Sequence, residues 1–407
     1  MLVSDYNYEL PEERIAKFPP KERGSTRLLV LNRKTGVIQD SYYKNLDQFL
    51  NPGDVLILND TRVMQSRLFC TLPDGRKREL VVLERHGNEP QRVMYRGKLH
   101  EGDRLRIARA MFGNNVSETV RDNGSGMSEE PRDDGRDEAS RGGIVPNIMV
   151  VKILGNGIAE VESDTPLAEL AEKYGTVPLP PYLHRDATDD DKKRYQTIWA
   201  KQMGSAAAPT ASLNMTEDLL DRLKKKGVII KYLTLHVGLG TFLPIRSDKV
   251  EDHHMHSEWF HIPEDTLRAI QAVRSERESQ MHSPRNASSR PSSRGSSLRP
   301  LPSSRMLRGE AFADSRHRII ALGTTVARTL EYYAKTGKTE GEDDIFIYPG
   351  FEFKLVDALI TNYHAPKSTV LMLASAFAGW EHLKAAYDYA LTEKYNFLSY
   401  GDSMLIY

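Results

Sequence analysis

The stretch from residue 63 to residue 161 constrains the fold more than any other part of this chain. It contains six short runs of aliphatic, aromatic and β-branched residues: SRLFCTL, ELVVLER, QRVMYR, DRLRIA, IMVVKIL and IAEVES. Turn signals such as Asp74–Gly75, Gly102–Asp103 and Gly155–Asn156–Gly157 separate the runs. Many short strands without a helical period predict a small antiparallel barrel or sandwich.

Strands and helices alternate on both sides of this stretch. DVLIL at 54–58 suits a buried strand, and two further strands are expected at 318–322 and 358–361. Helical patterns follow them at 326–335 and 369–378, and another helix is expected from Asp189 through Trp199. We therefore predict a discontinuous α/β domain, residues 1–62 with 162–407, into which the β domain of residues 63–161 is inserted.

Two tracts of biased composition interrupt these domains. Residues 113–145 are dominated by Gly, Asp, Glu, Arg and Ser, and residues 275–316 by Ser, Arg and Pro. Neither tract has enough apolar side chains to offset the entropy lost on ordering, so we predict two disordered inserts.

The overall composition excludes several classes of protein. Lys plus Arg equals Asp plus Glu at 56 each, so a nucleic-acid partner would have to bind local patches. Cys70 is the single cysteine, which rules out an internal disulfide. The chain has no apolar run of the ~18 residues that a membrane span requires, and its first 20 residues resemble neither a signal nor a transit peptide. We expect a cytoplasmic protein.

Four expected strands end in loops of small and polar residues. The loops cover residues 59–62, 236–242, 323–325 and 362–364. In open α/β sheets ligands bind beyond the carboxyl ends of the strands, so the four loops predict one shared site. Gly238 and Gly240 do not form a Rossmann fingerprint, because a third glycine is missing at the required spacing and Pro244 follows instead of a helix.

A histidine cluster follows the second of these loops: His253, His254 and His256, with Glu258. Imidazole and carboxylate groups are suitable metal ligands, but the cluster lacks HExxH spacing and a cysteine partner. We therefore predict no metal, and expect one or two of these groups to position or deprotonate a substrate. The alternative is a βα turn whose histidines are simply solvated.

Many motifs in this chain resemble one family. They include DYNYELPEERIAKFP, LNPGDVLILNDTRV, VPLPPYL, the APTA of residues 208–211, TLHVGLGTF, HHMHSEWF, IFIYPGF, TNYHAPKSTVLML and EKYNFLSYGD. In this order they resemble the S-adenosylmethionine:tRNA ribosyltransferase-isomerase family of queuosine biosynthesis. The resemblance runs from Asp5 to the last residues and is interrupted only by the two biased tracts. It implies an α/β domain from both chain ends with an inserted β-barrel.

The resemblance also implies a reaction. The ribosyl moiety of S-adenosylmethionine is transferred to 7-aminomethyl-7-deazaguanine at the tRNA wobble position and isomerised, which gives epoxyqueuosine and releases adenine and methionine. S-adenosylmethionine is a substrate, and no cofactor is implied. The expected partner is a tRNA with a GUN-type anticodon, and we expect a monomer that does not bind membranes.

Such a reaction needs a base beside the sulfonium and polar groups that guide the departing adenine. By their positions in the matching motifs, we expect catalytic roles for Asp60, Arg62, His236, Thr241, His256 and Glu258. We expect substrate binding by Gly238, Gly240, Thr324, Asn362, His364 and Asp402. The alternative for Arg62 and Asp402 is structural ion pairing.

One departure from the family pattern bears on activity. After APTA the family has Gly-Leu-His-Phe, whereas this chain has Ser212–Leu213–Asn214–Met215. An amide that cannot titrate therefore stands where the family has a histidine. The alternative function is a catalytically impaired paralogue that still binds tRNA or S-adenosylmethionine.

Overall fold

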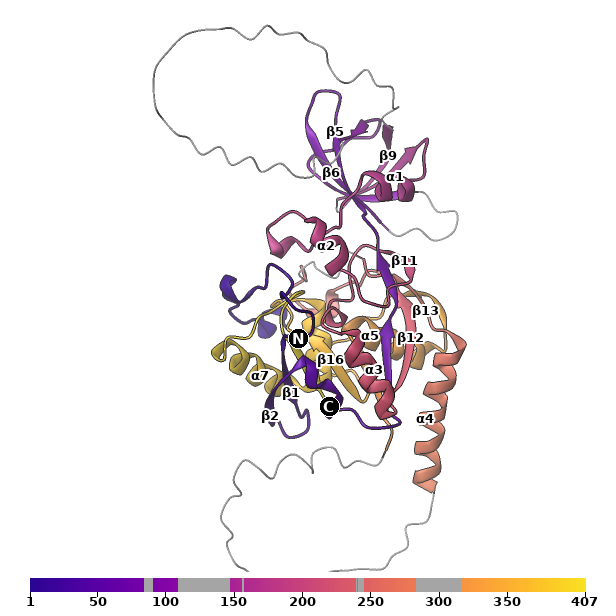
Figure 1. The fold of residues 1–407 in the computed structure, drawn as a ribbon. Coiled ribbons are helices and arrows are strands. Elements are labelled where there is room, and N and C mark those ends of the chain that lie inside the picture. The colour runs from indigo at the N-terminus through magenta and orange to yellow at the C-terminus, as the bar shows by residue number, and fades with distance from the viewer. Residues whose placement is uncertain (84–90, 109–146, 156, 239, 241–244, 283–315) are drawn as a thin grey trace, which may run out of the picture. The chain divides into compact units, whose positions relative to one another are not determined.

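The computed structural model describes residues 1–83, 91–108, 147–155, 157–238, 240, 245–282 and 316–407. The chain forms two compact units, Met1–Met64 with Leu179–Tyr407, and Gln65–Pro178 (Figure 1). The predicted disordered inserts fall largely outside the described residues.

The second unit is built on a closed antiparallel barrel. Its strands follow the spatial order β10 (Ile158–Ser163), β7 (Gln91–Arg96), β6 (Lys77–Val82), β5 (Arg67–Thr71), β8 (Arg104–Ile107) and β9 (Asn147–Gly155). Each of the six β-prone runs forms one strand. The barrel prediction is therefore confirmed, and the sandwich alternative is wrong. Alternate residues such as Leu68, Leu80 and Leu105 are buried in the barrel core.

Helix α1 (Leu167–Tyr174) belongs to the barrel unit. Its buried residues Leu167, Leu170 and Ala171 join the apolar cluster of the barrel interior. The predicted domain boundary at residue 161 assigned this helix to the α/β domain, whereas the structure extends the second unit to Pro178. The difference arises because the apolar stripe of α1 completes the core of the barrel.

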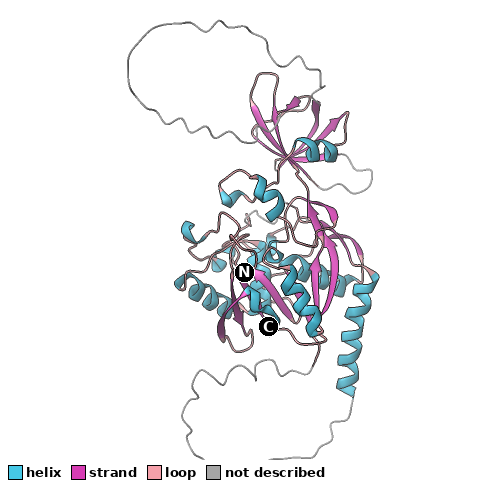
Figure 2. Ribbon diagram, in the orientation of Figure 1, coloured by secondary structure: helices cyan, strands magenta, loops and turns pink. Residues whose placement is uncertain are grey.

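The first unit contains a nine-stranded mixed sheet with helices on its faces (Figure 2), which confirms the predicted α/β class. In spatial order the strands are β15 (Glu340–Asp343), β13 (Glu258–His261), β12 (Ile229–Leu235), β3 (Val55–Asn59), β14 (Ile319–Leu322), β16 (Ala358–Asn362), β17 (Ser403–Ile406), β1 (Arg27–Leu31) and β2 (Ile38–Tyr42). The four consecutive strands β12, β3, β14 and β16 are parallel. A separate two-stranded sheet pairs β4 (Thr61–Val63) with β11 (Gln202–Ser205).

The α-helices of this unit are α2 (Asp189–Arg194), α3 (Glu217–Lys226), α4 (Glu264–His282), α5 (Thr324–Thr336), α6 (Thr369–Ala378) and α7 (Trp380–Thr392). Short 3₁₀ helices form at Val3–Tyr6, Glu12–Arg14, Tyr43–Gln48, Pro181–Leu183, Thr210–Ser212 and Val250–Asp252. Across the described ranges, no helix is long and apolar enough to cross a membrane.

Two helices differ from their predicted extents. Helix α2 ends at Arg194 instead of reaching Trp199, because the chain turns there and the Trp199 indole donates a hydrogen bond to the Asn59 carbonyl. Helix α4 continues to His282, so the predicted insert beginning at residue 275 starts too early. Arg277 on α4 pairs with Asp357, and this contact anchors the last turns of the helix.

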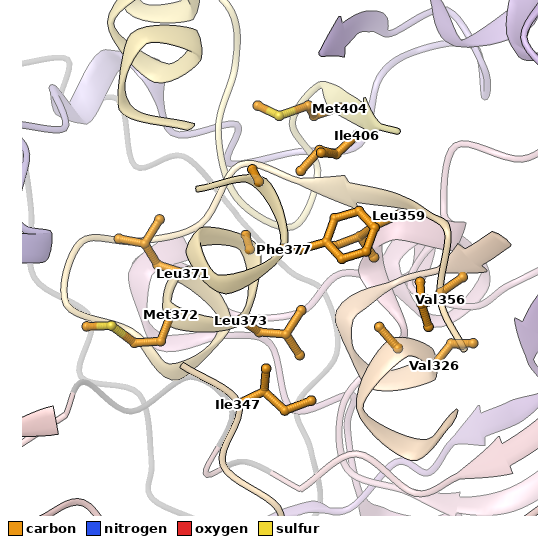
Figure 3. Close-up of a cluster of buried hydrophobic side chains, with 14 of the residues drawn as sticks. Val326, Ile347, Val356, Leu359, Leu371, Met372, Leu373, Phe377, Met404 and Ile406 are labelled. Carbon is orange, nitrogen blue, oxygen red and sulfur yellow. The ribbon is translucent and has the colours of Figure 1, made fainter. Parts of the chain in front are cut away.

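The two faces of the sheet pack against different clusters. In β14, Ile319 and Ala321 join the cluster under α4 to α7, whereas Ile320 and Leu322 join the cluster under α3. Figure 3 shows part of the first cluster, where Leu359, Met404 and Ile406 of the sheet lie near Leu371, Leu373 and Phe377 of α6. Because both faces are covered, the central strands are apolar on both sides.

Candidate active site

The carboxyl ends of β12, β3, β14 and β16 lie at one edge of the sheet. These strands are neighbours and run parallel, so the loops that follow them meet at this edge. The four strand ends therefore lie together as expected, but none of residues 59–62 is among the described residues that line the pocket. The Asn59 side chain joins two of these ends, because it donates to the Leu235 carbonyl at 2.9 Å and accepts from the Thr61 amide at 3.0 Å.

A pocket opens at this edge, entirely within the first unit. It contains about 690 Å³ of empty space, part of it open to solvent. Its described lining comes from the strand ends and from several other segments. It comprises Tyr182, residues 208–211, Val237, residues 323–325, residues 361–365, Ser368, Val370, Leu398 and Ser399.

Two polar side chains are held in place at the pocket wall. The Thr210 hydroxyl donates to Oδ1 of Asn362 at 3.0 Å, and Nδ2 of Asn362 donates to the Asp402 carbonyl at 3.4 Å. Thr324 and Thr325 form the first turn of α5, where backbone N–H groups have no intrahelical acceptor. The wall therefore offers an oriented amide and a helix N-terminus that favours a negative group.

His364 is a neutral imidazole in the pocket wall. Its Nε2 lies 2.9 Å from the Thr361 hydroxyl, and burial lowers its pKa to about 3. Its backbone is also fixed, because its N–H donates to the Tyr387 hydroxyl at 2.9 Å and its carbonyl accepts from the Tyr8 hydroxyl. At neutral pH this ring is suited to hydrogen bonding and does not carry a charge.

A second group of polar residues lies at the ends of β3 and β12. Nδ1 of His236 is 2.8 Å from the Thr61 hydroxyl, and the ring stacks on Trp259 with centroids 5.2 Å apart. Oδ1 of Asp60 accepts from the Thr234 hydroxyl at 2.7 Å, and burial raises the pKa of Asp60. A raised pKa brings a carboxylate closer to the range in which it acts as a general base.

Gly204 makes room for the His236 ring. A Cβ at position 204 would lie 2.5 Å from Nε2 of His236, closer than real Cβ contacts. The glycine also has a φ of +154°, which side chains disfavour. Gly240 has the same function for His256, because a Cβ there would lie 2.6 Å from that ring.

Glu258 lies in the third group, behind the turn that follows β12. Its Oε1 accepts from the Gly238 amide at 2.7 Å and lies 3.3 Å from Nε2 of His256. Burial alone would raise the pKa of Glu258, but the charge of Arg328 and the contact with His256 lower it to about 2. Glu258 is thus a buried carboxylate whose charge is favoured by the Arg328 guanidinium.

The predicted site residues therefore occupy different places. Three of them, Thr324, Asn362 and His364, line the pocket. The described lining does not include Asp60, Arg62, His236, Gly238, Gly240, His256, Glu258 or Asp402. Arg62 is exposed on β4, without an ion-pair partner among the described residues. Thr241 lies outside the described residues.

Asp402 has a structural contact instead of a pocket contact. Its carboxylate accepts hydrogen bonds from the backbone amides of Arg27 and Asn396, both at 2.7 Å. Its side chain therefore fixes the chain near β1 and β17. The ion pairing considered for Asp402 is replaced by these two backbone contacts.

Sequence reasoning did not identify Arg328 or Asp343. For Arg328 the one signal in the sequence is that a charged residue stands among the apolar residues of α5. These are Val326, Ala327 and Leu330, all of which are buried. Within the described ranges, no group of three or more His, Cys, Asp or Glu side chains is arranged to hold a metal ion.

Comparisons with known proteins cover the whole chain. A family model described as queuosine biosynthesis protein matches residues 3–281 and 305–406. Proteins named S-adenosylmethionine:tRNA ribosyltransferase-isomerase from Pelodictyon phaeoclathratiforme and Chlorobium phaeobacteroides are 43% and 44% identical over 415 residues, with 100% of both chains covered. A crystal structure of S-adenosylmethionine tRNA ribosyltransferase from Thermotoga maritima is 28% identical, covers 99% of this chain and 100% of its own, and has a TM-score of 0.47.

Proposed function

The chain belongs to the queuosine biosynthesis protein family and is a transferase-isomerase, and from this premise we propose the following reaction. It transfers the ribosyl moiety of S-adenosylmethionine to the aminomethyl group of 7-aminomethyl-7-deazaguanine at the tRNA wobble position. The ribosyl group is rearranged to an epoxycyclopentane, and adenine and methionine are released.

The observation that carries this proposal is the pocket at the carboxyl edge of the four parallel strands. An oriented amide (Asn362), two threonines at a helix N-terminus and a neutral imidazole (His364) form its polar wall. An amide can pair with the polar edge of a purine, and a helix N-terminus favours the carboxylate of the methionine part. We assign S-adenosylmethionine to this pocket.

In this proposal the base that removes a hydrogen next to the sulfonium is Asp60 or His236, which directly follow β3 and β12. Neither lines the pocket, but Val237, the residue after His236, does. Burial raises the pKa of Asp60, and Thr61 orients the His236 ring through Nδ1. Both properties suit proton transfer. The tRNA is expected to carry a GUN-type anticodon, and the enzyme is expected to act as a cytoplasmic monomer without a cofactor.

The experiment measures adenine released from S-adenosylmethionine. Purified protein is incubated with a tRNA that carries 7-aminomethyl-7-deazaguanine and, in parallel, with the unmodified tRNA. Release that depends on the modified base supports the proposal. Binding of the modified tRNA without release of adenine contradicts it and leaves the impaired paralogue.

A matched pair of variants tests the assignment of the pocket. Thr324→Val removes a hydroxyl from the pocket wall. Thr329→Val removes a buried hydroxyl further along the same helix, whose one hydrogen bond within the described part of the chain goes to the Thr325 carbonyl. We expect kcat/KM to fall ~10-fold for Thr324→Val, the cost of one lost hydrogen bond, and to change little for Thr329→Val. Equal effects would count against this pocket.

A further inference from the structure

Arg328 lies directly behind the pocket wall. It follows Thr324 by one helical turn of α5, and its side chain is buried. A second hollow, lined in part by Met255, Thr325 and Arg328, shares Thr324, Thr325 and Val370 with the pocket. A displacement of the Arg328 side chain would therefore be transmitted to the pocket through these shared residues.

Arg328 bridges two carboxylates that the sheet places side by side. Glu258 on β13 and Asp343 on β15 are direct partners in the antiparallel register, and both are fully buried. Like charges opposite one another repel. The Arg328 guanidinium pairs with Glu258, and its Nε lies 3.3 Å from Oδ2 of Asp343, so one cation holds α5, β13 and β15 together.

The same ion pair reaches the turn after β12. Glu258 accepts the Gly238 amide and contacts His256, and the His256 ring lies against Gly240. Val237, the residue before this turn, lines the pocket. A planar guanidinium can hold two carboxylates in fixed directions, whereas an ammonium group is a point charge without that geometry.

We propose that Arg328 is a positioning residue, which acts through Glu258 to fix the Gly238 turn and the His256 ring next to the pocket. The inference rests on the proposed function for its kinetic test, but not for its structural test. Buried ion pairs often contribute little to net stability, so a role in positioning accounts for this one better than a role in stability.

The structural test is hydrogen exchange at the Gly238 amide, in the full chain without substrate. Arg328→Lys keeps the positive charge but loses the planar guanidinium that can hold both carboxylates. Arg318→Lys is the matched control, because Arg318 forms the same kind of pair with buried Asp54 at the opposite end of the sheet. When the two variants are compared under conditions that give them the same free energy of unfolding, we expect the Gly238 amide hydrogen to exchange at least ~10-fold faster in Arg328→Lys than in Arg318→Lys. Equal rates would overturn the proposal.

The kinetic test is a double-mutant cycle. We expect Arg328→Lys and Glu258→Gln each to lower kcat for adenine release by ~10²-fold, the scale of a misplacement of about 1 Å. If Arg328 acts through Glu258, the double variant should lose no more than the worse single variant. Losses that multiply to ~10⁴-fold, or an unchanged kcat in Arg328→Lys, would overturn it. If the wild type releases no adenine, the proposed function fails, and the exchange at Gly238 still decides this inference.

Discussion

Nδ2 of Asn214 donates a hydrogen bond to Oγ of Ser403 at 3.2 Å. The same nitrogen donates to the Gly401 carbonyl, also at 3.2 Å, and the side chain is buried. Asn214 is not among the described residues that line the pocket. The amide that stands where the resembled family has histidine thus holds the start of β17 and does not face the candidate substrate site.

Asn214→His is expected to leave adenine release within ~3-fold of the wild type. The larger ring must fit a filled interior, so the free energy of unfolding should fall by ~1–3 kcal/mol. Initial rates and urea denaturation measure the two quantities. A rise in kcat of ~10²-fold or more would instead mean that the missing histidine transfers a proton, and would support the impaired paralogue.

Gly204→Ala is expected to disturb His236. The added Cβ would lie 2.5 Å from Nε2 of that ring, so the ring must leave its contact with Thr61. Gly341→Ala is the matched control, because Gly341 also has a positive φ, +129°, but a Cβ there would lie within 4 Å of no atom of the described residues. Both variants should lose ~1–3 kcal/mol of stability through backbone strain. We expect only Gly204→Ala to lose, in addition, ~10–100-fold in kcat/KM, and equal kcat/KM values would contradict this role of Gly204.

The barrel and the convergence of the strand ends could be predicted because their signals are local. Six β-prone runs with turns between them became six strands, and polar loops directly follow the parallel strands. The role of Asp402 could not be predicted in this way. Its carboxylate binds the amide of Arg27, which is 375 residues away, and no short pattern encodes such a contact.

Arg328 was missed for the same reason. The role of Arg328 depends on the strand pairing that places Glu258 opposite Asp343. Such pairing is a property of the whole sheet and is not encoded by a local pattern. The boundary at residue 161 was wrong because a short amphipathic helix has the same pattern whether it packs on a barrel or on a sheet. Tertiary context decides such cases.

Cys70 is expected to be unreactive in the folded protein. It is buried in the barrel core, and burial raises the pKa of its thiol to about 12, so very little thiolate exists at pH 8. A thiol reagent such as dithionitrobenzoate should modify Cys70 at least ~100-fold more slowly in the folded protein than in the protein unfolded in about 6 M urea. A Cys70→Ser, Lys77→Cys variant, whose new thiol lies at an exposed position, should react rapidly in buffer. Fast modification of native Cys70 would show that the barrel opens readily.

His364 should make the protein less stable in acid. Burial lowers its pKa to about 3, below the ordinary value of 6.5, so the unfolded chain binds a proton there that the folded chain does not. The contribution of His364 to the free energy of unfolding should therefore fall as the pH decreases below 6.5, by ~2 kcal/mol at pH 5, and should not change above pH 6.5.

Urea denaturation at pH 7.5 and pH 5.0 measures the free energy of unfolding of the wild type and of His364→Gln. Other groups, such as Asp343, contribute to both proteins and cancel in the comparison. The wild type should lose ~2 kcal/mol more than the variant between the two pH values, and an equal loss in both proteins would show that the His364 ring takes up its proton without unfolding.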